Sequence, residues 1–250
     1  MTNPAPTADQ QLQALLAERI NRWTGQLAQA FGMTVQGGPF KGMVLPEKSS
    51  WSGGYLAPKL LGCYEAELHQ SIEKAIERRP SVVINVGCAE GFYAIGLARR
   101  LPKAQVHAFD ISTDAQTSCA LAAERNGVAD RVAVHGLCES QQLIDLTKDC
   151  KRALIVLDCE GAELQLLDEA TVKQLAHCDI IVELHDFVDP SITPTLTQRL
   201  AATHKTKTMR EGPRDPAEHT ILHTLGSFDR WMLVCEFRPA LMRWMVAWAR

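Results

Sequence analysis

The sequence predicts an α/β fold built on a doubly wound, mostly parallel β-sheet with helices on both faces. Two observations support this prediction. Between residues 81 and 203, five short apolar segments alternate with five helical segments, which is the pattern of successive βαβ units. The chain has 250 residues, enough for one sizeable core but short of two full domains. Right-handed crossovers then leave few possible topologies.

A helical cap is expected before this alternation. Residues 9–31 repeat Leu, Ile, Trp and Phe at steps of three and four, which predicts an amphipathic helix. Residues 34–54 are rich in Gly, Ser and Pro and predict turns. A second helix is expected over residues 57–79, with a break near Gly62 and an end at Pro80.

The alternating region supplies the elements of the sheet. Short runs of apolar and β-branched residues predict the strands, and longer segments with helical periodicity predict the helices between them. The expected strands cover residues 81–86, 104–111, 131–136, 152–158 and 179–184, and the expected helices cover residues 92–100, 113–126, 140–148, 162–175 and 194–203.

The tail after residue 203 departs from this alternation. Residues 204–211 and 230–237 resemble two further strands, separated by a polar loop over residues 212–229 with no full-length helix. Two strands joined without a crossover helix predict an antiparallel edge strand on the sheet. Residues 239–250 are expected to form a short helix that packs on the body of the protein.

The composition excludes several classes of partner. A net charge of −3 supplies no basic stripe for nucleic acid or an anionic membrane. No apolar run approaches the roughly 20 residues that span a bilayer, and the N-terminus lacks the features of a secretory signal. The eight cysteines include no C-x-x-C pair, as expected for reduced thiols. We expect a cytoplasmic protein without nucleic-acid or membrane partners.

Glycines and polar residues follow the expected strands. Ligands bind at this edge in open parallel sheets, near the point where strand order reverses. These groups are Gly87–Gly91, Asp110, residues 136–139, residues 158–161, and His185 with Asp186. They are therefore expected to surround one site.

The turn Gly87–Gly91 does not match the phosphate-binding patterns. A dinucleotide fingerprint needs G-x-G-x-x-G, but Ala89 occupies the middle glycine position and Phe92 the third. Glu90 lies inside the turn, where a carboxylate would repel a pyrophosphate. The turn therefore suits a nucleoside without phosphates, preferably one that carries positive charge.

Asp110 ends the second strand, about twenty residues after the glycine turn. An acid at that position can accept hydrogen bonds from both ribose hydroxyls of a nucleoside. Such charge-assisted bonds contribute about 1.5–3 kcal/mol each. Alternatively, Asp110 caps the following helix, which the sequence Asp-Ile-Ser-Thr also allows.

Two longer stretches resemble a known enzyme family. "VINVGCAEGFYAIGLARRLP" and "VHAFDIS" are similar to the first two motifs of class I S-adenosylmethionine-dependent methyltransferases. "LIVLDCEGAELQLLD" and "IIVELHDF" resemble the FkbM-type branch, whose fourth strand ends in D-x-E-G-x-E. The resemblance covers about Ser81 to Phe187. It implies a Rossmann-like catalytic domain over residues 81–250, with residues 1–80 as a helical, lid-like segment of the same compact unit.

The resemblance implies S-adenosyl-L-methionine as cofactor and assigns residues to it. Gly87, Cys88 and Gly91 would lie along its methionine part, and Asp158 would face the methionine amino group or the acceptor. The full implied set is Asn85, Gly87, Cys88, Ala89, Glu90, Gly91, Phe92, Asp110, Ile111, Leu137, Cys138 and Asp158.

Two positions depart from the family pattern. The family commonly has Asp where this chain has Asn85, so Glu90 is expected to supply part of the missing charge. The family often has an acid near Leu137 for the adenine amino group. Adenine recognition is therefore expected to depend on backbone groups and Glu139.

Methyl transfer to a hydroxyl group needs a base for the acceptor proton. His185 follows a strand on the ligand edge and has an ordinary pKa of about 6.5, and Asp186 is expected to orient it. A purely structural role at the strand end is the alternative for His185. Asp158 and Glu160 are the other catalytic candidates, whereas Glu163 is expected to face the start of the next helix.

Metal binding is the alternative interpretation of these residues. Asp158, Glu160, Glu183 and His185 could supply ligands for Mg²⁺, and strand alternation points Glu183 and His185 to the same side. We nevertheless expect no resident metal. His219 and His223 have helical spacing but no third ligand nearby, so zinc is not expected either.

The acceptor itself is not readable from the sequence. The loop 212–229 and the lid-like segment around Tyr64 and Glu65 are the expected walls of its pocket. We expect a small molecule methylated on a hydroxyl oxygen, with a nitrogen or carboxylate acceptor, a nicotinamide-dependent reductase and a non-catalytic binding module as alternatives. The first helix and the Trp-rich C-terminal segment are possible contacts of a homodimer.

Overall fold

The computed structural model describes residues 7–46 and 56–250. Their central feature is a seven-stranded sheet with the order β3-β2-β1-β4-β5-β7-β6. The strands are β1 (Val82–Val86), β2 (Gln105–Phe109), β3 (Val132–His135), β4 (Ala153–Leu157), β5 (Asp179–Leu184), β6 (His204–Arg210) and β7 (Arg243–Ala249). The first five are mutually parallel, which confirms the predicted strands and their order along the chain.

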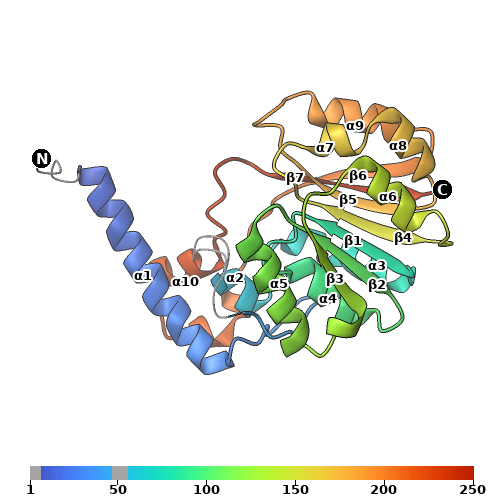
Figure 1. Ribbon diagram of the computed structural model, residues 1–250. Coiled ribbons are helices and arrows are strands. Elements are labelled where there is room, and N and C mark those ends of the chain that lie inside the picture. Colours follow the sequence, from blue (N-terminus) through green and yellow to red (C-terminus); the bar gives the residue numbers. More distant parts are fainter. Residues whose placement is uncertain (1–6, 47–55) are drawn as a thin grey trace, which may run out of the picture.

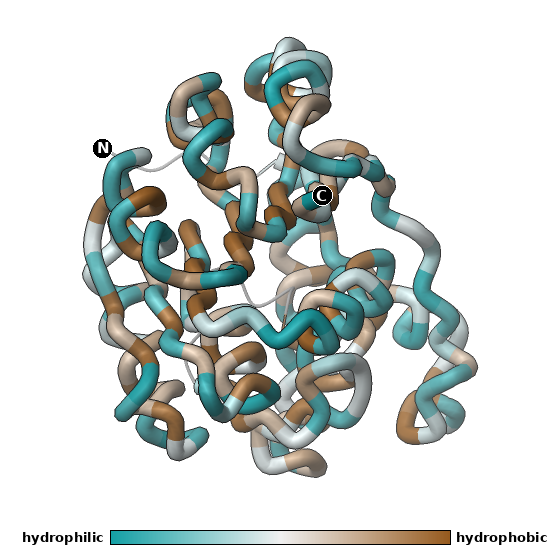
Figure 2. Tube along the Cα trace, turned by 90° about the vertical axis from the view of Figure 1, so that its right-hand side faces the viewer, coloured by the Kyte–Doolittle hydropathy of each residue, from teal (hydrophilic) through white to brown (hydrophobic). Residues whose placement is uncertain are grey.

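Helices cover both faces of this sheet (Figure 1). On one face lie α3 (His69–Glu77), α4 (Phe92–Arg100) and α5 (Thr113–Arg125), and on the other lie α6 (Ser140–Thr147), α7 (Glu163–Leu166), α8 (Glu169–Gln174) and α9 (Ile192–Leu200). Each face buries its own apolar cluster against the strands. Figure 2 shows hydrophobic residues along the strands in the middle of the molecule and hydrophilic residues on the outer loops.

Strand order reverses at β1, which pairs with β2 on one side and β4 on the other. The chain leaves β1 toward α4 and the β2 side, whereas β4 starts the run toward the other edge. This reversal creates the crevice at the carboxyl ends of the strands where open α/β sheets bind ligands. The turn Gly87–Gly91 therefore lies at the expected place.

Two expected helices are divided by identifiable breaks. The N-terminal one becomes α2 (Leu56–Leu61), a 3-10 turn at Ala66–Leu68, and α3. Gly62 causes this break, since its φ is +79° and a Cβ atom would lie 2.4 Å from the backbone of Gly37. The helix expected over residues 162–175 becomes α7 and α8, because Asp168 caps α8 by accepting a hydrogen bond from the Thr171 N–H.

The tail corrects two predictions. Residues 230–237 were expected to be a strand, but most of them belong to helix α10 (Ser227–Val234). Residues 239–250 were expected to be a helix, but they contain strand β7. In β7, Trp244 and Val246 pack into one apolar cluster and Met245 and Ala247 into the other. A run that is buried on both faces has no polar alternation to distinguish it from a helix.

The predicted antiparallel pair at the sheet edge is confirmed, although its second strand is β7 and not residues 230–237. β7 pairs antiparallel with both β5 and β6, so it is second from the edge and β6 is the edge strand. This arrangement makes β6 parallel to the first five strands. It also brings the segment just before β7 to the carboxyl edge, next to the end of β5.

Helix α1 (Ala8–Phe31) confirms the first predicted helix but buries little of it. Its N-terminal half extends away from the sheet (Figure 1), and Leu12 and Leu15 are 56% and 64% exposed. Its middle packs beside α10, where Arg19 binds Asp229 at 2.5 and 2.8 Å. Within residues 7–46 and 56–250, no helix combines the length and apolar composition that crossing a membrane requires.

Candidate active site

A cavity of about 760 Å³ opens at the carboxyl edge of the sheet. Its lining comes from the ends of β1 to β5, from Lys59 and Tyr64 of the helical cap, and from residues 238–242. The structure therefore brings part of the cap against the strand ends, whereas its lid-like role stays a prediction. The cap residues 49–55 of that prediction lie outside the described part of the chain.

The glycine turn at the cavity is fixed by its backbone. Gly87 has a φ of +73°, and a Cβ atom on it would lie 1.6 Å from the carbonyl oxygen of Asp158. The N–H groups of Gly87 and Cys88 both donate to the carbonyl of Phe109 at 2.9 Å. Gly91, with a φ of +91°, starts α4. The turn thus joins the ends of three strands, and only glycine fits its first position.

Asp110 ties this turn to the second strand. Its carboxylate accepts hydrogen bonds from the N–H groups of Ala89 at 2.8 Å and Ser112 at 2.9 Å. Each carboxylate oxygen keeps a lone pair for a further donor. The cap of α5 is Ser112, which accepts from the Ala115 N–H, so the alternative role of Asp110 as helix cap is wrong.

Two large apolar side chains at the cavity are exposed to solvent. Ile111 is 80% exposed and Leu137 is 67% exposed, although both line the cavity. Large apolar groups in such positions are available to a flat, apolar part of a ligand. Glu139, which was expected to help bind adenine, instead forms a capping box with Gln142 at the start of α6.

The predicted cofactor-binding and catalytic residues divide into two groups. Nine predicted site residues line the cavity: Gly87, Ala89, Asp110, Ile111, Leu137, Cys138, Asp158, Glu160 and His185. Five others, Asn85, Cys88, Glu90, Gly91 and Phe92, do not line it.

Glu90 and Asn85 differ most from expectation. The buried carboxylate of Glu90 pairs with the buried ammonium group of Lys59, so its charge is already compensated. Asn85 is 1% exposed, and its amide donates weakly to the carbonyl of Val156 at 3.5 Å. Neither residue therefore offers its charge or amide to the cavity.

Beside the cavity, four carboxylates surround His185. We call this set, Asp158, Glu160, Glu163, Glu183 and His185, the acidic cluster. The imidazole Nδ1 lies 2.5 Å from Glu163 Oε1. Nε2 lies 3.4 Å from Glu160 Oε2, 3.6 Å from Asp158 Oδ1 and 3.8 Å from Glu183 Oε2. The ends of β4 and β5 thus bring together residues that the sequence placed in two separate motifs.

The acidic cluster controls the protonation of His185. Burial opposes the charged imidazolium, but the hydrogen bond to Glu163 and the charges of Asp158 and Glu160 outweigh it and raise the pKa of His185. Burial also raises the pKa of Glu160 above its ordinary value.

Glu163, rather than Asp186, orients His185. The Asp186 carboxylate accepts from the Thr193 N–H at 3.0 Å and from its hydroxyl at 2.7 Å, because Asp186 points away from the cluster. Glu163 begins α7 as expected, but its side chain is fully buried against the histidine. Glu163 is the last acid of the D-x-E-G-x-E stretch, and this motif is the sequence feature that could have identified Glu163 as a site residue.

The comparisons with known proteins concern the fold. No protein-family model and no curated protein matches the chain. Among solved structures, the human methyltransferase 10 domain containing protein matches with a TM-score of 0.52 and 14% identity, over 93% of this chain and 96% of that one.

The chain has a Rossmann-like methyltransferase fold. Two further structures are similar to it at lower TM-scores. One is precorrin-6y C5,15-methyltransferase from Geobacter metallireducens GS-15, with a TM-score of 0.49 and 13% identity over 73% of this chain and 89% of that one. The other is the O-methyltransferase TomG from Streptomyces achromogenes, with a TM-score of 0.47 and 14% identity over 93% of this chain and 89% of that one. The FkbM-type resemblance stays a prediction.

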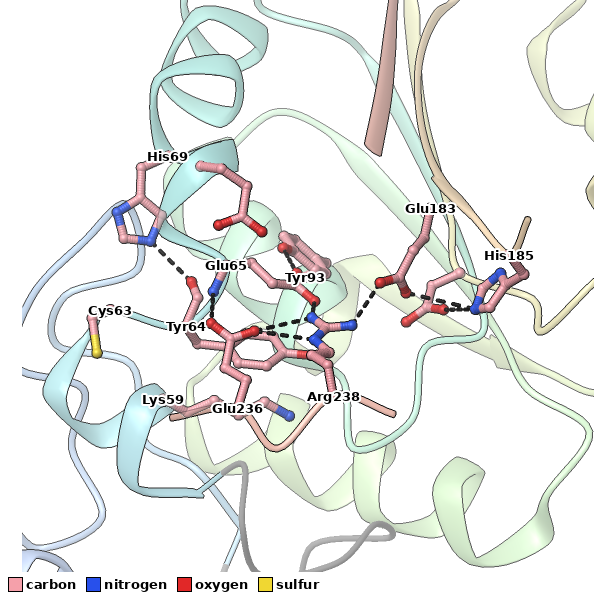
Figure 3. A network of polar contacts seen from close by, with 12 residues as sticks. Lys59, Cys63, Tyr64, Glu65, His69, Tyr93, Glu183, His185, Glu236 and Arg238 are labelled. Atoms are coloured by element: carbon pink, nitrogen blue, oxygen red, sulfur yellow. Dashed lines mark hydrogen bonds and ion pairs between the residues drawn. The ribbon is translucent and has the colours of Figure 1, made fainter. Parts of the chain in front are cut away.

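A second buried network adjoins the acidic cluster of this methyltransferase fold (Figure 3). Arg238 binds Glu183 Oε1 at 2.6 Å and Glu236 Oε2 at 3.1 Å, and it also pairs with Glu65. Burial raises the pKa of Glu65 to about 7 and that of Glu183 to about 11. Neither Arg238 nor Glu236 was predicted as a site residue, because Glu236 was expected on a strand over residues 230–237 and Arg238 directly after it.

The loop 212–229 contributes to this network rather than to the cavity. Arg214 binds Glu236 at 2.5 Å and Glu67 at 2.7 Å. His219 and His223 do not line the cavity. Among the described residues, one group has the composition and spacing to hold a metal ion, and it consists of Asp158, Glu183 and His185.

Proposed function

We propose that this protein transfers a methyl group from S-adenosyl-L-methionine to a hydroxyl oxygen of a small-molecule acceptor. The observation that carries the proposal is that one cavity is lined by two unlike sets of groups. Gly87 and Asp110 line it at the point of strand reversal, and Asp158, Glu160, Glu183 and His185 of the acidic cluster line it as well. The cavity volume of about 760 Å³ is typical of sites for small molecules.

The residues present fit the cofactor. Asp110 would accept hydrogen bonds from the ribose hydroxyls, since each of its oxygens has a lone pair left beside its backbone bond. Ile111 and Leu137 would contact the adenine ring with their exposed side chains. The cofactor supplies a methyl group on a positively charged sulfur, and the carboxylate of Asp158 would favour that charge.

Proton transfer would depend on the acidic cluster. In the reaction the methyl carbon leaves sulfur and bonds to the acceptor oxygen, which gives up its proton. His185 was the first candidate base, but it is only 1% exposed and its Nδ1 is held by Glu163 at 2.5 Å. Glu160 lines the cavity, its side chain is 58% exposed, and burial raises its pKa, so it is better suited to accept the proton.

The charge of the cluster also limits the acceptor. Asp158, Glu160 and Glu183 line the cavity, and the negative charge among them would repel an anionic acceptor, which argues against methylation of a carboxylate. They would attract an amine. An amine is therefore the second candidate acceptor, and a hydroxyl compound without negative charge is the first.

Calorimetry tests the cofactor part of this proposal. We expect S-adenosylmethionine and S-adenosylhomocysteine to bind, and we expect no binding of NAD, because the turn lacks the glycine pattern that cradles a pyrophosphate. If neither of the first two bound at millimolar concentration, the proposal would be overturned. A panel of sugars, phenols, amines and carboxylates, assayed for formation of S-adenosylhomocysteine, would then identify the acceptor class.

A further inference from the structure

His185 has the environment of a metal-binding histidine. It is 1% exposed, and Glu163 Oε1 lies 2.5 Å from its Nδ1. Glu163 is itself fully buried and accepts a second hydrogen bond, from the Gly161 N–H at 3.2 Å. A carboxylate that accepts the Nδ1 proton leaves the lone pair of Nε2 directed at the opposite side, as in carboxylate–histidine–metal arrangements.

The oxygens that face Nε2 are not placed as hydrogen-bond partners. They lie 3.4 to 3.8 Å away, beyond the usual 2.7–3.2 Å of about linear N–H···O bonds. Around an ion with bonds of about 2.1 Å, neighbouring ligand atoms lie about 3.0–3.4 Å apart. Ligand atoms of Asp158, Glu183 and His185 all lie within 4.8 Å of one another, so small shifts would bring them onto one ion.

Two further observations show that Glu183 and Asp158 each have an oxygen available to an ion. Arg238 Nη1 holds Glu183 Oε1 at 2.6 Å, which leaves Oε2 on the side of His185. Asp158 Oδ1 is buried and has no hydrogen-bond partner among the described residues, although it lies 3.6 Å from Nε2. A buried carboxylate oxygen without a donor is costly unless a cation compensates it.

The site also holds more acidic groups than cations. Four carboxyl groups meet His185, and Arg238, the neighbouring cation, is shared with Glu65 and Glu236. A divalent cation would balance the carboxylates that bind it. The mixed ligand set indicates a transition-metal ion, since imidazole suits ions such as Fe²⁺ and Zn²⁺ and carboxylates suit Mn²⁺, whereas Mg²⁺ and Ca²⁺ prefer oxygen ligands.

We propose that Asp158, Glu183 and His185 bind a divalent transition-metal ion of the Mn²⁺ class, with Glu163 as the residue that positions His185. The metal site itself does not depend on the proposed function, but any role of the ion in the reaction rests on the proposed methyl transfer. An ion on these residues, which line the cavity, would lower the pKa of an acceptor hydroxyl group bound to it. Glu160, outside the ligand set, would remain available for the released proton.

Binding of Mn²⁺ to the full chain, freed of metal by a chelator and without cofactor, tests the proposal. Titration at pH 8, followed by calorimetry and by the paramagnetic resonance of free Mn²⁺, should show one ion per chain. Pulsed resonance on the bound ion should show coupling to an imidazole nitrogen. This second readout needs no variant and reports the histidine directly.

Variants locate the ion. We expect His185→Gln and Asp158→Asn to weaken Mn²⁺ binding about 100-fold or more, and Glu163→Gln about 10- to 100-fold, since it acts only through His185. Glu169→Gln on the surface of α8 is the matched control and should bind as the wild type does. Circular dichroism establishes that each variant is folded.

Three results would overturn the metal site: no Mn²⁺ binding at millimolar concentration, bound ion without nitrogen coupling, or equal affinity in wild type and folded His185→Gln. Calorimetry with S-adenosylmethionine separates this failure from failure of the proposed function. Binding of the cofactor without Mn²⁺ would leave methyl transfer standing, and binding of Mn²⁺ without the cofactor would leave the metal site standing.

Discussion

Gly87 packs so closely against the carbonyl oxygen of Asp158 that only a hydrogen atom fits between them. A Cβ atom would lie 1.6 Å from that oxygen, in a residue whose φ is +73°. We expect Gly87→Ala to lower the free energy of unfolding by more than about 2 kcal/mol, because the strand ends must separate. Urea denaturation measures this change.

Gly25→Ala provides the control for this prediction. Gly25 lies within α1, and a Cβ atom there would meet nothing within 4 Å. The control should stabilise the protein by about 0.5–1 kcal/mol, since alanine favours the helix. If Gly87→Ala unfolded at the wild-type urea concentration, the close contact with Asp158 would be wrong.

Asp110 carries the predicted ribose contact. We expect Asp110→Ala to weaken S-adenosylmethionine binding by ~10–100-fold, through loss of one or two charge-assisted bonds. Calorimetry measures the affinity, and Asp114→Ala, an exposed acid in the first turn of α5, is the control. An affinity unchanged by Asp110→Ala would exclude the ribose role.

Glu160 is the residue to which we assign the acceptor proton. Glu160→Gln should lower turnover on the true acceptor by about 10²–10⁴-fold, since glutamine cannot take up a proton, and it should leave cofactor affinity within about twofold. Steady-state rates and calorimetry measure the two quantities. Wild-type turnover in this variant would remove Glu160 as the base and return the role to His185 or Asp158.

At the scale of elements, α2 is joined to the glycine turn by a buried ion pair. Lys59 and Glu90 have side chains that are 7% and 4% exposed. Lys59→Met would leave the Glu90 carboxylate buried without its cation, and we expect a loss of about 3–5 kcal/mol in the free energy of unfolding. The double variant Lys59→Met/Glu90→Gln should recover most of that loss in urea denaturation. A double variant no more stable than Lys59→Met would contradict this account.

Strand β7 is an example of a short buried strand that sequence patterns do not predict. Its residues Arg243–Ala249 are almost continuously apolar, since Trp244 faces one core cluster and Met245 the other. Strands β1, β4 and β5 are also largely buried, but glycines, prolines and polar turns bound them, and helical segments separate them. Without such flanks, a short apolar run fits a helix or a strand equally well.

At the scale of the whole molecule, the buried carboxylates make stability depend on pH. The pKa of Glu65 is raised to about 7, mainly by burial, whereas an unfolded glutamate has a pKa of about 4.3. Between these values the native state holds a proton that the unfolded state releases. The contribution of Glu65 to the free energy of unfolding therefore falls as pH rises from about 4.3 to 7.

Glu65→Gln tests this dependence, because glutamine resembles the protonated acid and does not titrate. The unfolding free energy of the variant, relative to that of the wild type, should increase as pH rises from about 4.3 to 7. Urea denaturation at a series of pH values measures the difference. A difference that stayed constant over this range would show that Glu65 has an ordinary pKa.

The sequence by itself determined the five βα units, the edge where ligands bind, and the pairing of the glycine turn with Asp110. These features follow from local periodicity and from the rule that carboxyl ends of parallel strands meet at one edge. Only the tertiary structure decided that β7 lies inside the sheet, that Lys59 compensates Glu90, and that Glu163 orients His185. Such contacts join residues as far apart as Glu65 and Arg238, 173 positions along the chain, and packing rather than local pattern selects them.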